Sequence, residues 1–279
     1  MTPKTFLLGL GAQKCATTWL FENLKSDPAF APGATKEYHV WDALHVVGLW
    51  RMQLQKPPPS APEVLRLKYE FQTNPDAYFD YFCTLLDQSN IRLVADITPS
   101  YSGLPGSVIK DISARFESRG VTCKAVFLMR DPLERLWSTI RMNKRRQFER
   151  SRANPDPEAT QVFDENEMIK TKLRWQATHI RSRYDLTLTE IDKALSEQNV
   201  FFGIYEELFE PHTISRLSEF TGLNFSPESL NAHSNNSPKT DVLDPEVEYA
   251  VVREFECVYR YCAERFPQVK ELWRGFDLL

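Results

Sequence analysis

Short apolar runs with abrupt ends occur at four places along the 279-residue chain, and each predicts a buried strand. Between and after these runs, apolar residues recur three and four positions apart, which is the spacing of an amphipathic helix. Strands that alternate with helices predict an α/β fold built on a parallel sheet. The predicted strands are residues 5–10, 91–97, 123–129 and 199–204, and the predicted helices are residues 17–25, 75–88, 107–116, 133–144, 165–181, 189–195, 208–221 and 245–264.

Three segments interrupt this pattern and are predicted to be irregular. Residues 56–62 are rich in proline, which excludes a helix interior or a central strand. Residues 151–157 form a second break, and residues 226–245 form a long polar loop of a length typical of functional loops. None of them marks a domain boundary, so we expect one domain over residues 1–279.

Charge and cysteine content exclude several classes of protein. The 34 Lys and Arg against 38 Asp and Glu give a net charge of −4, whereas a duplex-DNA-binding domain is usually basic, so no nucleic-acid partner is expected. The 5 cysteines include no CxxC pair, which predicts reduced thiols rather than a metal or disulfide framework. No apolar run approaches the roughly 20 residues of a membrane span, so no integral membrane segment is expected.

The loop after the first predicted strand has the composition of an anion cradle. The segment GLGAQKCATTW at positions 9–19 offers glycines, the lysine Lys14 and the hydroxyls of Thr17 and Thr18 at a helix start. Backbone N–H groups at a helix N-terminus bind anions, and an ammonium group adds positive charge. The segment lacks the GxxxxGK[ST] spacing of a Walker A loop. A strand–turn–helix with a surface lysine is the alternative interpretation.

A second candidate site follows the third predicted strand, in the segment KAVFLMRDPLERLWS at positions 124–138. Asp131 suits a helix N-cap, Pro132 the first helical position and Glu134 a capping box. Arg130 and Ser138 would then stand where a guanidinium and a hydroxyl could hold a second phosphate. Arg130 could equally be a structural ion-pair partner.

Together the two loops resemble the nucleotide-binding motifs of sulfotransferases that use 3′-phosphoadenosine 5′-phosphosulfate (PAPS). The segments QKCATTWL, at positions 13–20, and FLMRDPLERLWS carry this resemblance, and FGIYEEL at positions 202–208 resembles a later segment of the family. The resemblance implies a P-loop-like three-layer fold, with a central parallel sheet of four to five strands flanked by helices. It also implies acceptor-side insertions near residues 38–90 and 141–185.

The resemblance also assigns roles residue by residue. It implies that Lys14, Thr17 and Thr18 contact the 5′-phosphosulfate and that Arg130 and Ser138 contact the 3′-phosphate. Cys15 and Ala16 replace the usual Ser-Gly pair, and Lys239 lies where family members close a segment over PAPS. The full predicted nucleotide-binding set is Gln13, Lys14, Cys15, Ala16, Thr17, Thr18, Trp19, Arg130, Ser138 and Lys239.

The stretch TKEYHVW at positions 35–41 resembles the segment that carries the general base in glycan sulfotransferases. Glu37 would take the proton of the acceptor while Lys14 stabilises the leaving phosphate. His39 is the alternative base, and a solvated Lys36–Glu37 pair is the alternative without catalysis. Asp96, Thr98 and Tyr101 are expected to line the pocket, and Ile97 stands where some glycan enzymes have a second lysine.

The basic run at positions 141–152 could attract an acidic acceptor or the cofactor, or it could be a solvated helix face. The histidines form no metal-binding motif, so no metal is expected.

The predicted activity is transfer of a sulfuryl group from PAPS to a hydroxyl, or less readily an amine, of a small-molecule, lipid or glycan acceptor. Adenosine 3′,5′-bisphosphate (PAP) is the expected product. The first predicted strand starts near residue 5, which leaves no room for the membrane anchor of Golgi members and favours a cytoplasmic enzyme. A P-loop nucleotide kinase or NTPase and a non-catalytic nucleotide-binding module remain alternatives.

Overall fold

The computed structural model describes residues 3–153, 163–225 and 242–279, and these residues group into two compact units. Unit 1 comprises residues 3–129 and 186–225, and unit 2 comprises residues 130–185 and 242–279, apart from residues 154–162. Unit 1 contains the sheet, and unit 2 consists of helices and short turns. Lys239 lies outside the described residues, as does most of the predicted loop at 226–245.

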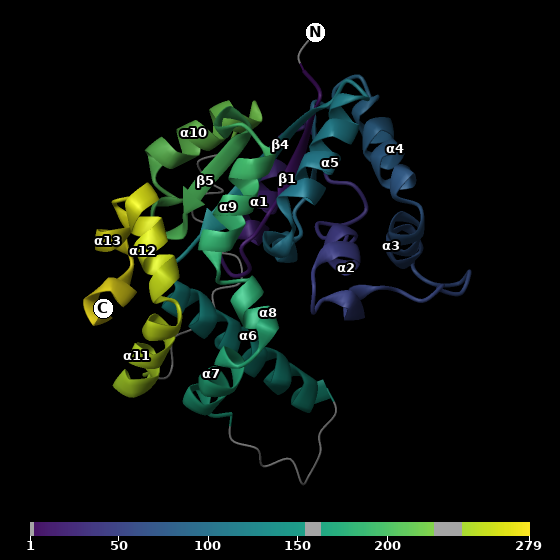
Figure 1. Ribbon diagram of the computed structural model, residues 1–279. Coiled ribbons are helices and arrows are strands. Elements are labelled where there is room, and N and C mark those ends of the chain that lie inside the picture. The colour runs from purple at the N-terminus through teal and green to yellow at the C-terminus, as the bar shows by residue number, and fades with distance from the viewer. Residues whose placement is uncertain (1–2, 154–162, 226–241) are drawn as a thin grey trace. The chain divides into compact units, whose positions relative to one another are not determined.

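Five parallel strands form the sheet of unit 1, in the order β2-β3-β1-β4-β5 (Figure 1). The register pairs Leu8 with Asp96 and Gly9 with Val126, so the carboxyl ends of β1, β3 and β4 lie at one edge. The predicted α/β class is confirmed, and each of the four predicted strands is present. The strands are β1 (Thr5–Gly9), β2 (Phe30–Ala31), β3 (Leu93–Asp96), β4 (Thr122–Met129) and β5 (Val200–Ile204).

Alternate residues of the strands face different helices, as the period of two in a strand requires. On one face, Phe6 stacks on Phe116 of α5 (Gly106–Glu117) at 4.0 Å between ring centroids and also contacts Phe82 of α4 (Pro75–Leu86). On the other face, the Lys124 Nζ donates to the Phe220 carbonyl of α10 (Pro211–Thr221). The sheet is therefore covered on both faces, which explains why its strands read as continuous apolar runs.

Four further helices belong wholly or mainly to unit 1. The apolar side chains of Trp19, Leu20 and Leu24 are buried along α1, which follows β1 directly. The α3 helix was not predicted, because it follows the proline-rich segment 56–62 and most of its residues are at least partly exposed. These helices are α1 (Thr17–Leu24), α2 (Trp41–His45), α3 (Glu63–Thr73) and α9 (Tyr184–Ala194).

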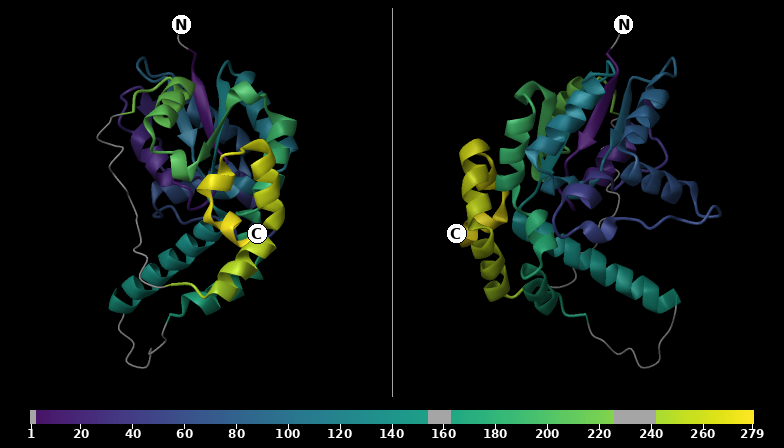
Figure 2. Two further views of the ribbon diagram at one scale, coloured as in Figure 1. Left: turned by 90° about the vertical axis from the view of Figure 1, so that its left-hand side faces the viewer. Right: turned by 45° about the vertical axis from the view of Figure 1, so that its right-hand side comes forward.

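Unit 2 is built around α6 (Pro132–Ala153), a helix of 22 residues that continues past the predicted end at residue 144 (Figure 2). The predicted break at 151–157 is therefore wrong up to Ala153, and its remainder lies outside the described residues. α6 packs against α7 (Glu165–Leu173) and α11 (Pro245–Glu254). The unit also contains α8 (Gln176–Ile180), α12 (Glu256–Arg265) and α13 (Val269–Leu272).

Two predicted long helices are each divided in unit 2. Residues 165–181 form α7 and α8, because Trp175 adopts an extended backbone with φ −95° and ψ 125°. Residues 245–264 form α11 and α12, with Phe255 between them at φ −107° and ψ 18°. Among the described residues, no helix has the length and apolar character needed to cross a membrane.

Candidate active site

The loop between β1 and α1 carries a run of left-handed backbone conformations. Gly11, Lys14 and Ala16 have φ angles of 105°, 70° and 67°. Left-handed residues alternating with ordinary ones turn successive N–H groups toward one side and form an anion-binding concavity. A left-handed conformation costs a residue with a Cβ about 1–2 kcal/mol, so the loop holds Lys14 and Ala16 against their intrinsic preference.

Ala16 is also the residue that starts α1, and no side chain caps this helix end. The N–H groups of the first helical turn have no intrahelical carbonyl partner, and the helix dipole gives them partial positive charge. Thr17 is buried and Thr18 half-buried in this first turn. The loop between β1 and α1, which we call the cradle, therefore has the backbone conformation and the two threonine hydroxyls expected of an anion-binding loop.

The other residues predicted for this loop differ in exposure. Gln13 and Lys14 are half-buried, whereas Cys15 and Trp19 are buried. Trp19 packs edge-on against Phe209, with ring centroids 5.2 Å apart. The Gln13 Oε1 is buried without a hydrogen-bond partner, so this loop contains a polar atom that a bound ligand could satisfy.

Lys36 connects this cradle to the predicted base. Its Nζ lies 3.3 Å from the Thr17 Oγ1, 3.2 Å from the Thr18 Oγ1 and 2.7 Å from the Glu37 Oε1. The Lys36 carbonyl accepts from the N–H of Ile97, directly after β3, which fixes the segment against the sheet. The sequence indicated Lys36 only as a solvated partner of Glu37, and its contact with the two threonines depends on the fold.

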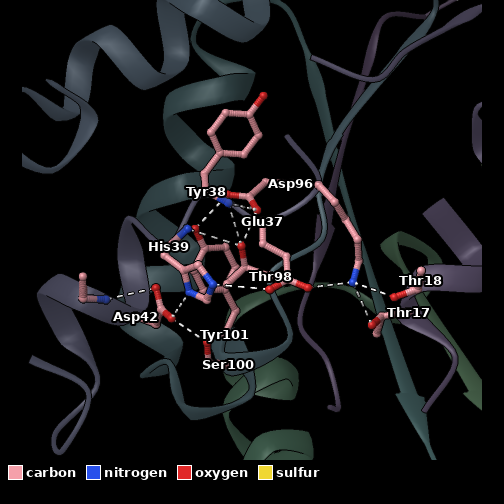
Figure 3. A network of polar contacts seen from close by, with 12 residues as sticks. Thr17, Thr18, Glu37, Tyr38, His39, Asp42, Asp96, Thr98, Ser100 and Tyr101 are labelled. Carbon is pink, nitrogen blue, oxygen red and sulfur yellow. Dashed lines mark hydrogen bonds and ion pairs between the residues drawn. The ribbon is translucent and has the colours of Figure 1, made fainter. Parts of the chain in front are cut away.

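Glu37, His39 and Asp42 form a row of alternating charges (Figure 3). The His39 Nε2 lies 3.3 Å from the Glu37 Oε2, and the His39 Nδ1 lies 2.8 Å from the Asp42 Oδ2. Figure 3 shows this row continuing from Glu37 toward Thr17 and Thr18 on one side and toward Ser100 on the other.

The pKa values of Glu37 and His39 are shifted in opposite directions. Burial would raise the pKa of Glu37, but the hydrogen bond from His39 and the charge of Lys36 outweigh it and lower the pKa to about 2. Burial would lower the pKa of His39, but its hydrogen bonds to Asp42 and Glu37 raise the pKa to about 9. At neutral pH, Glu37 is therefore a carboxylate and His39 an imidazolium.

Asp96, Thr98 and Tyr101 do not line the pocket, in contrast to the prediction, because none of them has any exposed surface. Asp96 accepts hydrogen bonds from the hydroxyls of Thr98 (2.6 Å), Tyr78 (3.0 Å) and Tyr101 (2.7 Å). Burial raises the pKa of Asp96 to about 6 despite these donors. The N–H of Tyr38 donates to the Thr98 Oγ1 at 3.0 Å, so this buried network anchors the segment that carries Glu37 and His39.

Arg130 and Ser138 belong to unit 2, at the start of α6. The Asp131 Oδ1 accepts from the N–H of Leu133 at 3.0 Å, which confirms Asp131 as the N-cap and Pro132 as the first helical residue. The Arg130 Nη2 lies 3.3 Å from the Glu134 Oε2, and Ser138 is buried two turns into the helix. Arg130, which directly precedes the N-cap of α6, is thus held by the Glu134 carboxylate in the first turn of that helix.

The first basic residues of the run 141–152 make contacts within unit 2. Arg141 is buried and stacks on Trp137 at 4.6 Å, and the Lys144 Nζ pairs with Glu165 at 3.2 Å. The basic residues later in the run are exposed on α6; they are Arg146, Arg150 and Arg152. Among the described residues, no group of three or more His, Cys, Asp or Glu side chains could hold a metal ion.

Comparison with known proteins identifies the family of the chain. The model of the sulfotransferase domain family matches residues 4–241, and the chain belongs to that family. It is a sulfotransferase, built on the P-loop-like α/β fold that the sequence predicted. No curated protein sequence matches the chain.

Solved sulfotransferase structures resemble the chain at low sequence identity. A sulfotransferase from Alicyclobacillus acidocaldarius is 15% identical and has a TM-score of 0.55, over 95% of this chain and 96% of that one. A sulfotransferase from Mycobacterium avium, STF9, is 14% identical with a TM-score of 0.49, over 93% and 77%. Mouse sulfotransferase SULT7A1, complexed with PAP, is 13% identical with a TM-score of 0.46, over 100% and 87%.

Proposed function

We propose that this sulfotransferase moves the sulfuryl group of PAPS to a hydroxyl of a small-molecule, lipid or glycan acceptor, without a metal ion. The observation that carries this proposal is the position of Lys36, whose Nζ contacts both cradle threonines and the Glu37 carboxylate. An anion-binding loop joined to a carboxylate by one ammonium group suits a reaction that needs positive charge beside a base.

The residues around the cradle fit the phosphosulfate end of PAPS. The Thr17 and Thr18 hydroxyls and the first-turn N–H groups of α1 would donate to its oxygens, and Lys14 and Lys36 would balance its charge. Arg130, which directly precedes the N-cap of α6, and Ser138, which lies within α6, would hold the 3′-phosphate.

Glu37 rather than His39 is the proposed base. Both ring nitrogens of His39 face carboxylate oxygens, so each of them carries a proton and neither can accept another. Glu37 is ionised, and its side chain retains 35% exposure. Its low pKa makes it a weak base in the free protein, so it accepts the hydroxyl proton only as that proton becomes acidic.

PAPS supplies an activated sulfuryl group with a phosphate as the leaving group. Glu37 takes the proton that the acceptor oxygen loses, and His39 keeps the Glu37 carboxylate in place. Lys36 lies between Glu37 and the cradle, where negative charge increases as the leaving phosphate departs.

The acceptor is proposed by class only. Aromatic side chains are dense around the base segment, since Tyr38 contacts Phe71, Tyr78 and Tyr81 at 5.9–6.3 Å. These rings are largely buried and contribute to the core of unit 1. Hydroxyl acceptors are favoured over amines, because a carboxylate base suits a neutral hydroxyl whereas most amines are protonated at neutral pH.

The donor and the acceptor are tested separately. We expect PAP to raise the melting temperature of the protein, because a ligand that binds only the folded state stabilises it. Incubation with ³⁵S-labelled PAPS and a panel of alcohols, phenols, lipids, glycans and amines should label at least one hydroxyl compound. Absence of stabilisation by PAP would overturn the donor assignment, and magnesium-dependent ATP turnover would indicate a nucleotide kinase or NTPase instead.

Substitution then tests the base. Glu37→Gln should lower the sulfotransfer rate by about 100-fold or more while PAP still stabilises the protein, because general base catalysis contributes typically about 10²–10⁴-fold. Glu22→Gln is the matched control, since Glu22 is an exposed glutamate of α1 that pairs only with Lys25 among the residues described. Full activity of Glu37→Gln would remove Glu37 as the base.

A further inference from the structure

A buried carboxylate outside the predicted site contacts His39. Asp42 lies in α2 and has no exposed surface. Its Oδ2 accepts from the His39 Nδ1 at 2.8 Å and from the Ser100 hydroxyl at 2.5 Å. Its Oδ1 accepts from the N–H of Ala43 at 3.0 Å. The carboxylate is thus held by donors from two different segments of unit 1 as well as by His39.

The backbone of His39 is also fixed in an unfavourable conformation. Its φ is 55°, in the left-handed region that non-glycine residues seldom adopt. The His39 N–H donates to the Thr98 Oγ1 at 3.4 Å, and its carbonyl accepts from the Gln72 Nε2 at 2.7 Å. Both the ring and the main chain of His39 are therefore restrained by surrounding groups, which is the pattern expected of a residue whose orientation matters.

Charged groups from several segments face His39 or its two carboxylates. Glu37 and Lys36 come from the same segment, Asp42 from α2, and Asp96 from the end of β3. Lys68 of α3 is half-buried, and its charge interacts with Asp96, Glu37 and Asp42. Two carboxylates, Glu37 and Asp42, thus contact the His39 ring directly, whereas Lys68 interacts with these carboxylates at longer range.

We propose that Asp42, held by Ser100, is a positioning residue that keeps His39 doubly protonated and so fixes the Glu37 carboxylate for proton transfer. This inference rests on the proposed role of Glu37 as the base. The geometry supports it because carboxylates only accept hydrogen bonds, so a ring placed between two of them has an N–H on each side. The imidazolium bound to Asp42 on one side then donates to the Glu37 Oε2 on the other.

Loss of the Asp42 carboxylate would weaken the hydrogen bond by which His39 holds the Glu37 carboxylate. An asparagine at position 42 could still accept from the Nδ1–H but would no longer attract a positive charge. His39 would then lose its second proton at a lower pH, and the neutral ring would hold the Glu37 carboxylate only by an uncharged hydrogen bond, which is weaker than the charge-assisted one. Sulfotransfer would fall at alkaline pH, whereas PAP binding would be unchanged because Asp42 contacts none of the cradle residues in the described contacts.

The first test measures the titration of His39 by NMR in the free protein, with no donor or acceptor present. The Cε1–H signal of His39 is assigned as the one absent from His39→Gln. We expect it to titrate near pH 9 in the wild-type protein. In Asp42→Asn it should titrate at least about one pH unit lower, a tenfold change in the acid dissociation constant.

Asp87→Asn is the matched control, because Asp87 is an exposed aspartate of unit 1 whose partner is Lys4. The control should titrate as the wild type does. A His39 signal that titrates at the same pH in Asp42→Asn and in the wild type would overturn the proposal. Ser100→Ala provides a variant that keeps the Asp42 carboxylate but removes a competing donor, so its His39 signal should titrate no lower than in the wild type.

The second test measures the pH profile of sulfotransfer. Asp42→Asn should lower kcat and move the alkaline limb to lower pH, with the KM for PAPS within about twofold of the wild type. A uniform loss of rate with an unmoved limb would indicate a merely structural role and overturn the proposal. If PAP fails to stabilise any of these proteins, the proposed function fails, while the NMR titration still decides whether Asp42 holds the second proton of His39.

Discussion

Lys36 and Thr18 are eighteen positions apart in the sequence, yet the Lys36 Nζ lies 3.2 Å from the Thr18 Oγ1. The same Nζ lies 2.7 Å from the Glu37 Oε1. One ammonium group therefore belongs both to the anion cradle at the start of α1 and to the proposed base. In the proposed function, donor binding and base chemistry would both depend on this side chain, which makes Lys36 the most informative position to substitute.

Replacing Lys36 with methionine keeps the length of the side chain and removes its charge. We expect Lys36→Met to weaken PAP binding about 10- to 100-fold, because a charge-assisted hydrogen bond contributes roughly 1.5–3 kcal/mol. Isothermal titration calorimetry measures the change. Lys25→Met is the matched control, since Lys25 is an exposed lysine after the other end of α1 that pairs with Glu22. Equal PAP affinity in the two variants would contradict a role of Lys36 in the cradle.

The raised pKa of His39 predicts a pH window for stability. The folded pKa of about 9 lies above the ordinary value of 6.5, so the stabilisation by His39 is complete below pH 6.5 and is lost as pH rises through 9. The difference in free energy of unfolding between the wild type and His39→Gln should therefore shrink by up to about 3 kcal/mol over this window. Urea unfolding at pH 6, 7.5 and 9.5 measures it.

His212→Gln is the control for this comparison, because His212 is an exposed histidine of α10. Its difference from the wild type, measured over the same pH range, is the baseline for the change at His39. If the difference for His39→Gln did not change beyond this baseline, His39 would not be the imidazolium that the two carboxylates require.

The strands were predictable from the sequence because each carries a strong local signal. The run at positions 123–129 is apolar along most of its length, which is typical of a strand buried on both faces. By contrast, β2 consists of only Phe30 and Ala31, and two residues are too few to show a period. The breaks at Trp175 and Phe255 contain neither glycine nor proline, so the sequence carried no signal of where those helices end.

The candidate site was predictable only where its residues form a local motif. Thr17, Thr18 and Glu37 were found from segments with recognisable spacing, and the structure joins them through Lys36. Asp42 directly follows the segment TKEYHVW and Ser100 lies between Thr98 and Tyr101, but no sequence spacing relates two residues that are 58 positions apart. Their contact exists only because the turn after β3 packs against α2, which no local pattern encodes.

Asp96 gives a second prediction about stability and pH. Its pKa is raised by burial, whereas the pKa of a carboxylate in a surface ion pair is lowered. Burial raises its folded pKa to about 6, above the ordinary value of 3.8, so the folded state binds this proton more tightly than the unfolded state. The corresponding stability is complete below pH 3.8 and is lost as pH rises through 6. Asp96→Asn resembles the protonated form, so its cost relative to the wild type should be larger at pH 4 than at pH 7.

Urea unfolding of the two proteins at pH 4, 5, 6 and 7 tests this expectation. The expected change in the difference is about 2 kcal/mol between pH 4 and pH 7, because the pKa shift is about two units and pH 4 lies just above the unfolded pKa. Asp87→Asn serves as the control, since Asp87 is exposed and paired with Lys4. A cost of Asp96→Asn that stays constant across this range would show that Asp96 titrates alike in the folded and unfolded states.

Gly11 is the position of the cradle loop that should tolerate a side chain least. Its φ is 105°, and a Cβ atom there would lie 2.6 Å from the Pro99 carbonyl oxygen, a backbone atom that cannot move aside alone. Gly120 provides a matched control in the same unit, with φ 73° and nothing within 4 Å of the added atom. Gly120→Ala carries only the conformational penalty of about 1–2 kcal/mol. Gly11→Ala adds a steric clash, for which overpacking costs of typically about 1–3 kcal/mol apply.

Chemical denaturation should therefore rank Gly11→Ala as the more destabilised protein, and PAP should stabilise it less than it stabilises Gly120→Ala. Equal stability and equal PAP response in the two variants would mean that the loop can rearrange away from Pro99 without losing the cradle.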